Sequence, residues 1–159
     1  MADIKPIPDG YHTITPYLVV NDARAAIQFY KEAFGAKELC VLAGPAGRVM
    51  HAEIQIGDSN LMLSDEYPGM DVLGPLSRGG ATSSLMIYVK DVDQLFEQAV
   101  KAGCTVKLPL TNQFWGDRYA KLADPFGHQW AIATHVEDVS GEEIDRRSKE
   151  IAKQMASAV

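Results

Sequence analysis

The sequence predicts an α+β fold in which two βαβββ modules form a curled mixed sheet around a cleft, followed by a C-terminal helix. Two β-rich runs, residues 15–22 and 84–91, begin 69 residues apart and both end in Val-x-Asp. An amphipathic segment follows each run, and clusters of Gly, Pro, Asp and Ser separate the strands expected after it. The internal repeat and the length of 159 residues therefore favour one two-module domain.

Each expected helix is bounded by a capping residue and a glycine. Asp22 and Asp91 are the predicted N-caps, and Gly35 and Gly103 follow the last turns. The apolar residues between these signals keep the i, i+3, i+4, i+7 spacing of a helix that buries one face. They are Ala26, Ile27, Tyr30, Ala33 and Phe34 in the first helix and Val92, Leu95, Phe96, Ala99 and Val100 in the second.

Three strands are expected after each helix. They cover residues 38–42, 49–56 and 60–64 in the first module and residues 105–110, 114–123 and 128–134 in the second. Module one then spans about residues 12–66, a Pro- and Gly-rich linker residues 67–81, and module two about residues 82–138. A capping box that starts at Ser140 predicts a final helix over about residues 141–156. Its apolar stripe is narrow, so it docks either on its own domain or on a partner.

Composition excludes several classes of partner. The net charge is −6 and no basic stripe is present, which argues against nucleic-acid binding. No apolar run reaches the length of a membrane helix, and the N-terminal residues lack the apolar region of a secretory signal. We therefore expect a cytoplasmic protein without a membrane partner. Cys40 and Cys104 form no CxxC motif, and we interpret both as reduced core thiols.

Several motifs carry a family resemblance. They are Val20-Asn-Asp22, Phe29-Tyr30 and Phe34-Gly35 at the opening of module one, and Asp124-Pro-Phe-Gly127-His128 before the last strand. With them, residues 12–138 resemble the vicinal oxygen chelate superfamily, which includes glyoxalase I, extradiol dioxygenases and the fosfomycin and bleomycin resistance proteins. The stretches 48–54, 61–65, 112–119 and 134–138 are similar to its PhnB-like glyoxalase branch. The resemblance implies a cleft between modules, often completed across a dimer, so a homodimer is expected.

The same resemblance locates the positions where metal-dependent members hold a divalent ion. Carried over by motif, these positions fall on Thr15, Met62, Ser84 and Ala131. Such ions need imidazole or carboxylate ligands, and none of these four side chains supplies one. We therefore expect no metal at this position and no cofactor, which places metal-dependent glyoxalase chemistry in doubt.

His51 and Glu53 are the candidate catalytic residues. They lie two apart in the expected strand 49–56, so their side chains leave the same face of the sheet, and Ala52 and Ile54 leave the opposite face. This alternation aims the His/Glu pair at the cleft. The pair suits acid–base work or polar ligand binding. A solvated polar sheet face and an unorthodox metal site are the alternatives.

Residues 114–119 form the second candidate site. Trp115 and Tyr119 offer flat apolar faces, and Arg118 suits bidentate binding of a carboxylate or phosphonate. The alternative is structural: an aromatic lid on the core, with Arg118 paired to Asp117 or Asp124. The further ligand-binding candidates are Tyr17, Met62, Met86 and His135. Strand parity turns the two methionines toward the cleft, although core packing explains them equally well, and it allows His135 to line the mouth of the cleft. His128, after a turn glycine, is interpreted as a structural cap of that turn.

Two functions remain open. The first is a metal-free small-molecule-binding protein whose ligand is small, partly aromatic or apolar, and carries one anionic group. The second is a glyoxalase-like lyase or isomerase that uses His51 and Glu53 as acid and base. Elemental metal analysis, together with a search for a retained ligand, separates them best.

Overall fold

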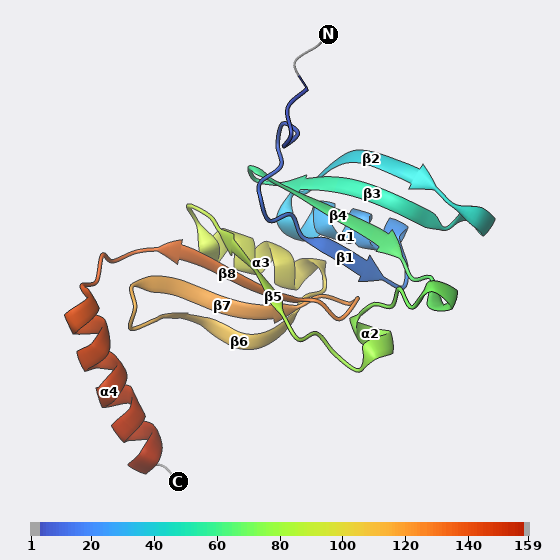
Figure 1. The fold of residues 1–159 in the computed structure, drawn as a ribbon. Helices are drawn as coiled ribbons and strands as arrows, with labels where there is room; N and C mark the ends of the chain where they lie inside the picture. The colour runs from blue at the N-terminus through green and yellow to red at the C-terminus, as the bar shows by residue number, and fades with distance from the viewer. Residues whose placement is uncertain (1–3, 158–159) are drawn as a thin grey trace.

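The computed structural model describes residues 4–157, which form two four-stranded sheets with a helix packed on one face of each (Figure 1). The first module consists of β1 (Tyr17–Val20), α1 (Ala23–Phe34), β2 (Lys37–Ala43), β3 (Val49–Ile56) and β4 (Ser59–Asp65), in sheet order β1-β4-β3-β2. The second consists of β5 (Ser84–Tyr88), α3 (Val92–Ala102), β6 (Thr105–Asn112), β7 (Asp117–Ala123) and β8 (Gln129–His135), in sheet order β5-β8-β7-β6. β1 pairs with β4 and β5 pairs with β8 in parallel, and the other ladders are antiparallel. The predicted pair of βαβββ modules is confirmed.

The helix boundaries follow from their caps. The Asp22 carboxylate accepts a hydrogen bond from the Ala25 amide at 3.0 Å, and Asp91 accepts one from the Gln94 amide at 3.0 Å. Gly35 ends α1 with φ of 67°, a left-handed conformation that glycine adopts without a steric cost. Both predicted N-caps are therefore confirmed.

The Pro- and Gly-rich stretch between the modules contains a 3₁₀ turn (Pro68–Met70) and the short helix α2 (Pro75–Arg78). One strand differs from the prediction. The strand expected to start at residue 114 starts at Asp117, since residues 113–116 form a turn closed by a hydrogen bond from the Gly116 amide to the Gln113 carbonyl at 3.1 Å. This turn changes which side chains of residues 114–119 share a face.

The two modules meet through α1 and α3 and through an aromatic cluster between them. The Phe34 and Trp130 rings lie 4.7 Å apart and those of Tyr30 and Trp130 lie 5.4 Å apart, while Phe29 packs edge-on against Phe126. His128 joins the modules as well, since its Nε2 lies 3.0 Å from the Val19 carbonyl oxygen. Within residues 4–157 no strand ladder joins the two sheets. The face of each sheet opposite its helix, called its open face below, carries exposed side chains, among them Tyr17 and Tyr88.

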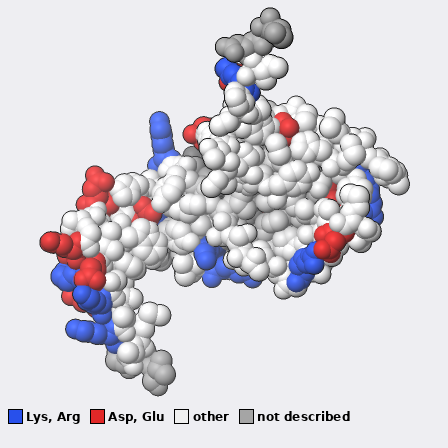
Figure 2. Space-filling model, in the orientation of Figure 1, with Lys and Arg blue, Asp and Glu red and all other residues white. Residues whose placement is uncertain are grey.

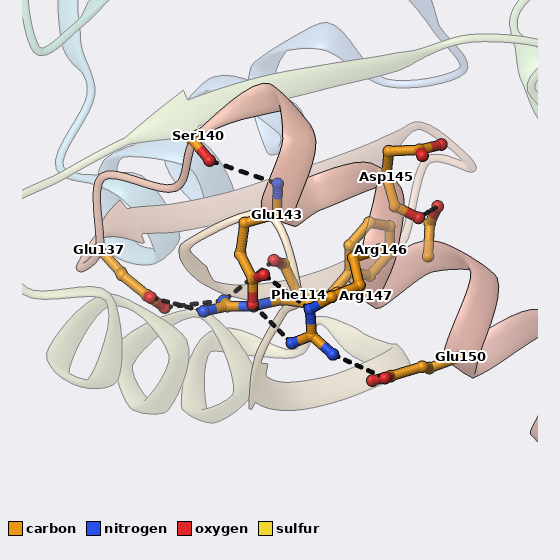
Figure 3. Close-up of polar contacts among 9 residues, drawn as sticks. Phe114, Glu137, Ser140, Glu143, Asp145, Arg146, Arg147 and Glu150 are labelled. Atoms are coloured by element: carbon orange, nitrogen blue, oxygen red, sulfur yellow. Dashed lines mark hydrogen bonds and ion pairs between the residues drawn. The ribbon is translucent and has the colours of Figure 1, made fainter.

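Helix α4 (Gly141–Ser157) is anchored at its start. Arg147 donates to Glu137 at 2.8 Å, to Glu143 at 2.7 Å and to the Phe114 carbonyl at 3.3 Å, and the Ser140 hydroxyl accepts from the Glu143 amide (Figure 3). The rest of α4 projects away from both sheets (Figure 1). The helix therefore contacts its own module through its first two turns.

None of the helices described between residues 4 and 157 combines the length and apolar character needed to cross a bilayer.

Candidate functional site

The alternation expected for β3 is present. Ala52 and Ile54 are fully buried beneath α1, while His51, Glu53 and Gln55 are half-buried on the opposite, open face of the sheet. If the register of β3 were shifted by one residue, the polar side chains would be buried without partners, at a cost of several kcal/mol for each charge. That cost is comparable to the whole free energy of unfolding of a typical domain. The packing of α1 therefore fixes His51 and Glu53 on the open face of the first sheet.

His51 is held between two polar groups. Its Nε2 lies 3.2 Å from Glu53 Oε1, and its Nδ1 lies 3.2 Å from the Tyr17 hydroxyl. A carboxylate can only accept, so Nε2 carries a proton, and in the neutral ring Nδ1 accepts from Tyr17. Tyr17 and Glu53 share this face because both lie opposite Met62 in β4. The arrangement sets the tautomer and orientation of the imidazole.

Tyr11 completes this group and had not been anticipated from the sequence. Its hydroxyl is enclosed beside Glu53, yet it makes no hydrogen bond of good geometry with any described residue. Burial first, and the Glu53 carboxylate second, raise the pKa of Tyr11 to about 12. Tyr11 and then His51 lower the pKa of Glu53, which keeps that side chain ionised. Tyr11 precedes the first strand, where no periodicity assigns a face to it.

An apolar cavity lies beside Tyr17, the hydrogen-bond partner of His51. Its volume is about 570 Å³, and its lining includes Tyr17, Val19, Pro45, Met50, Tyr67 and Met70. The Tyr67 hydroxyl is enclosed and also lacks a hydrogen-bond partner among the described residues. Tyr17 belongs both to the cavity wall and to the hydrogen bond with His51. The open face of the first sheet therefore combines an apolar volume with polar groups at its edge. A second cavity, of about 500 Å³, lies beside β5 and residues 12–16.

The second sheet carries its own polar cluster on its open face. Asp117 is buried and accepts from the Tyr88 hydroxyl at 2.8 Å, from Trp115 Nε1 at 3.0 Å and from His135 Nδ1 at 2.8 Å. Burial alone would raise the pKa of Asp117, but these hydrogen bonds outweigh it and lower the pKa. His135 also reaches Asp138 through Nε2 at 2.9 Å. Both imidazole nitrogens thus face carboxylates, which raises the pKa of His135.

The pH dependence of stability should reveal this cluster. Because the folded-state pKa of His135 is raised above 6.5, its stabilisation is complete below pH 6.5 and is lost as the pH rises through the raised value. We expect His135→Gln to lower the thermal unfolding midpoint at pH 6 and to approach the wild type at higher pH. The exposed His12, changed to Gln, is the control. Parallel profiles for the wild type and His135→Gln would contradict this role of His135.

The other candidates of residues 114–119 divide between the two faces of β7. Tyr119 lies on the open face, with its ring 5.6 Å from that of Trp115. Arg118 points to the helix side, where it forms a bidentate ion pair with Asp93 of α3 at 2.6 and 2.7 Å. An anionic ligand would have to compete with Asp93 for the Arg118 guanidinium. The partner of Arg118 is neither Asp117, which leaves the opposite face of β7, nor Asp124, whose carboxylate accepts from Tyr30 and Trp130.

The remaining candidates lie on the open faces. Met62 is half-buried between Tyr17 and Glu53, and Met86 is exposed opposite Ala131. Cys104 is buried as expected, and burial raises its pKa to about 12. Cys40 is not a core thiol: it is half-exposed and lies opposite Glu53.

The four positions at which the superfamily resemblance would locate a divalent metal ion lack suitable ligands. Across the parallel ladders, Met62 lies opposite Tyr17 and Ala131 lies opposite Met86. The Thr15 hydroxyl donates to the His12 carbonyl. None of the side chains of Thr15, Met62, Ser84 and Ala131 offers an imidazole or a carboxylate, so these four positions do not suit a zinc, nickel or iron ion.

Comparisons with known proteins agree with this architecture. The family model of the glyoxalase/bleomycin resistance protein/dioxygenase superfamily matches residues 10–132. The uncharacterized protein Mb0911c of Mycobacterium bovis is 43% identical over 134 residues, which cover 82% of this chain and 88% of that protein. The uncharacterized protein Rv0887c of Mycobacterium tuberculosis is also 43% identical, over 79% of its length.

Solved structures share the fold. PA1353 from Pseudomonas aeruginosa superposes with a TM-score of 0.64 at 24% identity, covering 79% of this chain and 99% of that one. TioX from Micromonospora sp. ML1 gives a TM-score of 0.62 at 24% identity with the same coverage, and the PhnB protein from Bacillus cereus gives 0.61 at 18% identity, covering 77% and 99%. On the family match and the two βαβββ modules, the chain belongs to the glyoxalase/bleomycin resistance protein/dioxygenase superfamily.

Proposed function

We propose that this protein binds a small, largely apolar or aromatic molecule in the cavity beside His51 and Glu53. The observation that carries the proposal is the cavity of about 570 Å³ on the open face of the first sheet. Its volume lies within the range typical of small-ligand sites, roughly 300–1,000 Å³. Such sites have an apolar lining with a few polar groups that orient the ligand. Here Met50 and Met70 contribute apolar lining, and the hydroxyls of Tyr17 and Tyr67 are available as polar groups.

The enclosed hydroxyls support a ligand with polar groups. An enclosed hydroxyl without a partner costs about 1–3 kcal/mol, which a bound molecule can offset by accepting or donating a hydrogen bond. Tyr67 borders the cavity and Tyr11 lies beside Glu53. The ligand proposed here therefore places an apolar body in the cavity and a polar end toward Tyr67 or toward the His51–Glu53 pair. It needs no ion at the Thr15, Met62, Ser84 and Ala131 positions.

We also propose that two copies close the cleft. The open faces of both sheets expose large apolar side chains, among them Tyr17 (49% exposed), Met50, Met86 and Tyr88 (61% exposed). Exposed apolar surface of this kind is typical of an interaction site. Figure 2 shows that charged side chains gather over α4, while much of the surface over the sheets carries none. Facing sheets from two chains would enclose the cavity. Sedimentation of the purified protein at dimer mass supports this assembly, and a monomer at all concentrations rejects it.

A lyase or isomerase activity is the second candidate. It is favoured by the fixed tautomer of His51, with Nε2 on an ionised Glu53, because a carboxylate and an imidazole in hydrogen-bond contact can move a proton from a bound carbonyl compound. Incubation with hemithioacetals and small 2-oxoaldehydes, followed by proton NMR, tests it. Turnover by the wild type that is lost in both His51→Gln and Glu53→Gln supports an enzyme. If the wild type shows no turnover, ligand binding is the only proposed function that remains.

A bulky side chain placed in the cavity should weaken ligand binding. Val19 is half-buried in the cavity wall, so Val19→Trp places an indole where the ligand would lie. We expect binding of the best compound from a panel of aromatic carboxylates, phosphonates and neutral analogues to weaken at least about tenfold, as measured by isothermal titration calorimetry.

Val100→Trp, on the exposed part of α3, adds the same ring away from the cavity and is the matched control. Arg118→Ala should leave all affinities unchanged because its guanidinium is paired with Asp93. A folded Val19→Trp protein that binds every compound like the wild type overturns the proposed site.

A further inference from the structure

We propose that Cys40, His51 and Glu53 form a zinc-binding site on the open face of the first sheet. One ligand atom from each side chain lies within 4.8 Å of the other two, and all three side chains are half-buried. Cys40 comes from β2 and the other two from β3. These residues are distinct from Thr15, Met62, Ser84 and Ala131, where the superfamily resemblance would locate an ion.

A bulge in β2 creates the cluster. Glu38 lies opposite Ile54, but the next pair along the ladder is Cys40 opposite Glu53, so Leu39 is the extra residue. In a regular ladder Leu39 would lie opposite Glu53. Bulges commonly re-aim a side chain in this way. Here the bulge brings a thiol to the face that carries an imidazole and a carboxylate.

The spacing suits tetrahedral zinc after a small adjustment. Zinc binds sulfur at about 2.3 Å and nitrogen or oxygen at about 2.0–2.2 Å, so its ligand atoms lie roughly 3.3–3.8 Å apart. His51 Nε2 and Glu53 Oε1 are 3.2 Å apart. Closing the remaining separations to Cys40 Sγ takes a shift of about 1 Å, which rotation of half-exposed side chains can supply. The fourth position stays open for water or another ligand.

The surroundings match those of a metal ligand. A metal-bound histidine usually holds its second ring nitrogen on a polar partner, and His51 Nδ1 lies 3.2 Å from the Tyr17 hydroxyl. With zinc on Nε2, that Nδ1 becomes the donor and the tyrosine oxygen the acceptor. The Tyr11 hydroxyl is enclosed beside Glu53 and makes no hydrogen bond of good geometry with the described residues, so it is free to turn toward a water on the ion. A zinc-bound water would satisfy it.

The ligand types favour zinc over magnesium or calcium. A thiolate is a soft ligand and an imidazole an intermediate one, whereas magnesium and calcium require oxygen ligands throughout. A thiolate and a carboxylate together also balance the two positive charges of the ion. Cys104 lies buried elsewhere in the core and cannot take the place of Cys40.

Zinc titration of the chelator-treated protein, in competition with a chromophoric chelator, tests the site. We expect one zinc per chain, and Cys40→Ser, His51→Gln and Glu53→Gln should each weaken affinity by more than the roughly 10–100-fold that loss of an outer-shell partner costs. Tyr17→Phe, which removes only the partner of His51, should fall within that 10–100-fold range. Cobalt should give a thiolate charge-transfer absorption that is absent in Cys40→Ser.

Cys104→Ala and His135→Gln are the matched controls, because each removes the same chemical group from a place outside the cluster, and both should bind zinc like the wild type. Absence of zinc uptake by the wild type, or zinc affinity that survives Cys40→Ser, overturns the proposal. The measurement uses zinc or cobalt alone, without an organic molecule. Its failure therefore leaves the ligand-binding proposal, tested by Val19→Trp, unaffected.

Discussion

Asp124→Ala is expected to lower the free energy of unfolding by roughly 3–5 kcal/mol, because it leaves buried donors without an acceptor. The Asp124 carboxylate is buried and accepts from the Tyr30 hydroxyl at 2.7 Å and from Trp130 Nε1 at 2.8 Å. It also accepts from the backbone amides of Phe126 and His128, both at 2.9 Å. Each buried donor left unpaired costs about 1–3 kcal/mol. Urea unfolding, followed by tryptophan fluorescence, measures the loss.

Two further variants locate the effect. Tyr30→Phe removes one hydrogen bond and leaves the others, so it should cost only about 1–1.5 kcal/mol. Asp58→Ala removes an exposed carboxylate in the turn between β3 and β4 and should change stability little. The Asp124→Ala and Tyr30→Phe effects should also be less than additive, because both remove the same bond. An Asp124→Ala protein within about 1 kcal/mol of the wild type would contradict this role.

The same network explains why the two modules should unfold together. Tyr30 belongs to α1 of module one, whereas Asp124 and Trp130 belong to module two. The hydroxyl of Tyr30 therefore makes a buried bond across the junction, and burial together with Asp124 raises its pKa well above the ordinary value. Module one cannot open at α1 without exposing the aromatic rings of module two.

Features set by short-range patterns could be predicted from the sequence. Strand alternation placed Ala52 and Ile54 under the helix and His51 and Glu53 on the open face. The capping role of Asp22 depends on a bond to a residue only three positions away. Such features require only the local period of the chain, which one sequence displays in full.

Features that depend on pairing between strands could not be predicted. The bulge at Leu39 brings Cys40 opposite Glu53, and no residue type in residues 38–42 signals it. Arg118 shares a face of β7 with the buried Leu122, and Asp93 pairs with it there only because α3 packs on that face. Neither the register between two strands nor the docking of a helix on a sheet is encoded in local composition.

Gly116→Ala is expected to destabilise the protein by roughly 3–5 kcal/mol, since both the conformation and the space at this position require glycine. Gly116 has a φ of 102°, and an added Cβ would lie 2.0 Å from the Glu137 carbonyl oxygen. The backbone must shift, because that atom belongs to the main chain. The Gly116 carbonyl accepts from the amides of Val136 at 2.9 Å and Glu137 at 3.0 Å, and both bonds depend on this close approach.

The change should reach the open face as well as the turn. Trp115 precedes Gly116 and donates to Asp117, so displacement of the turn should alter the near-UV circular dichroism of the folded protein along with its urea midpoint. Gly103→Ala is the matched control: its φ is 121°, yet an added Cβ would meet only Phe29 at 3.7 Å. That variant carries the backbone strain without the clash and should cost about 1–3 kcal/mol. Equal stability of the two variants would show that the contact with Glu137 does not constrain the turn.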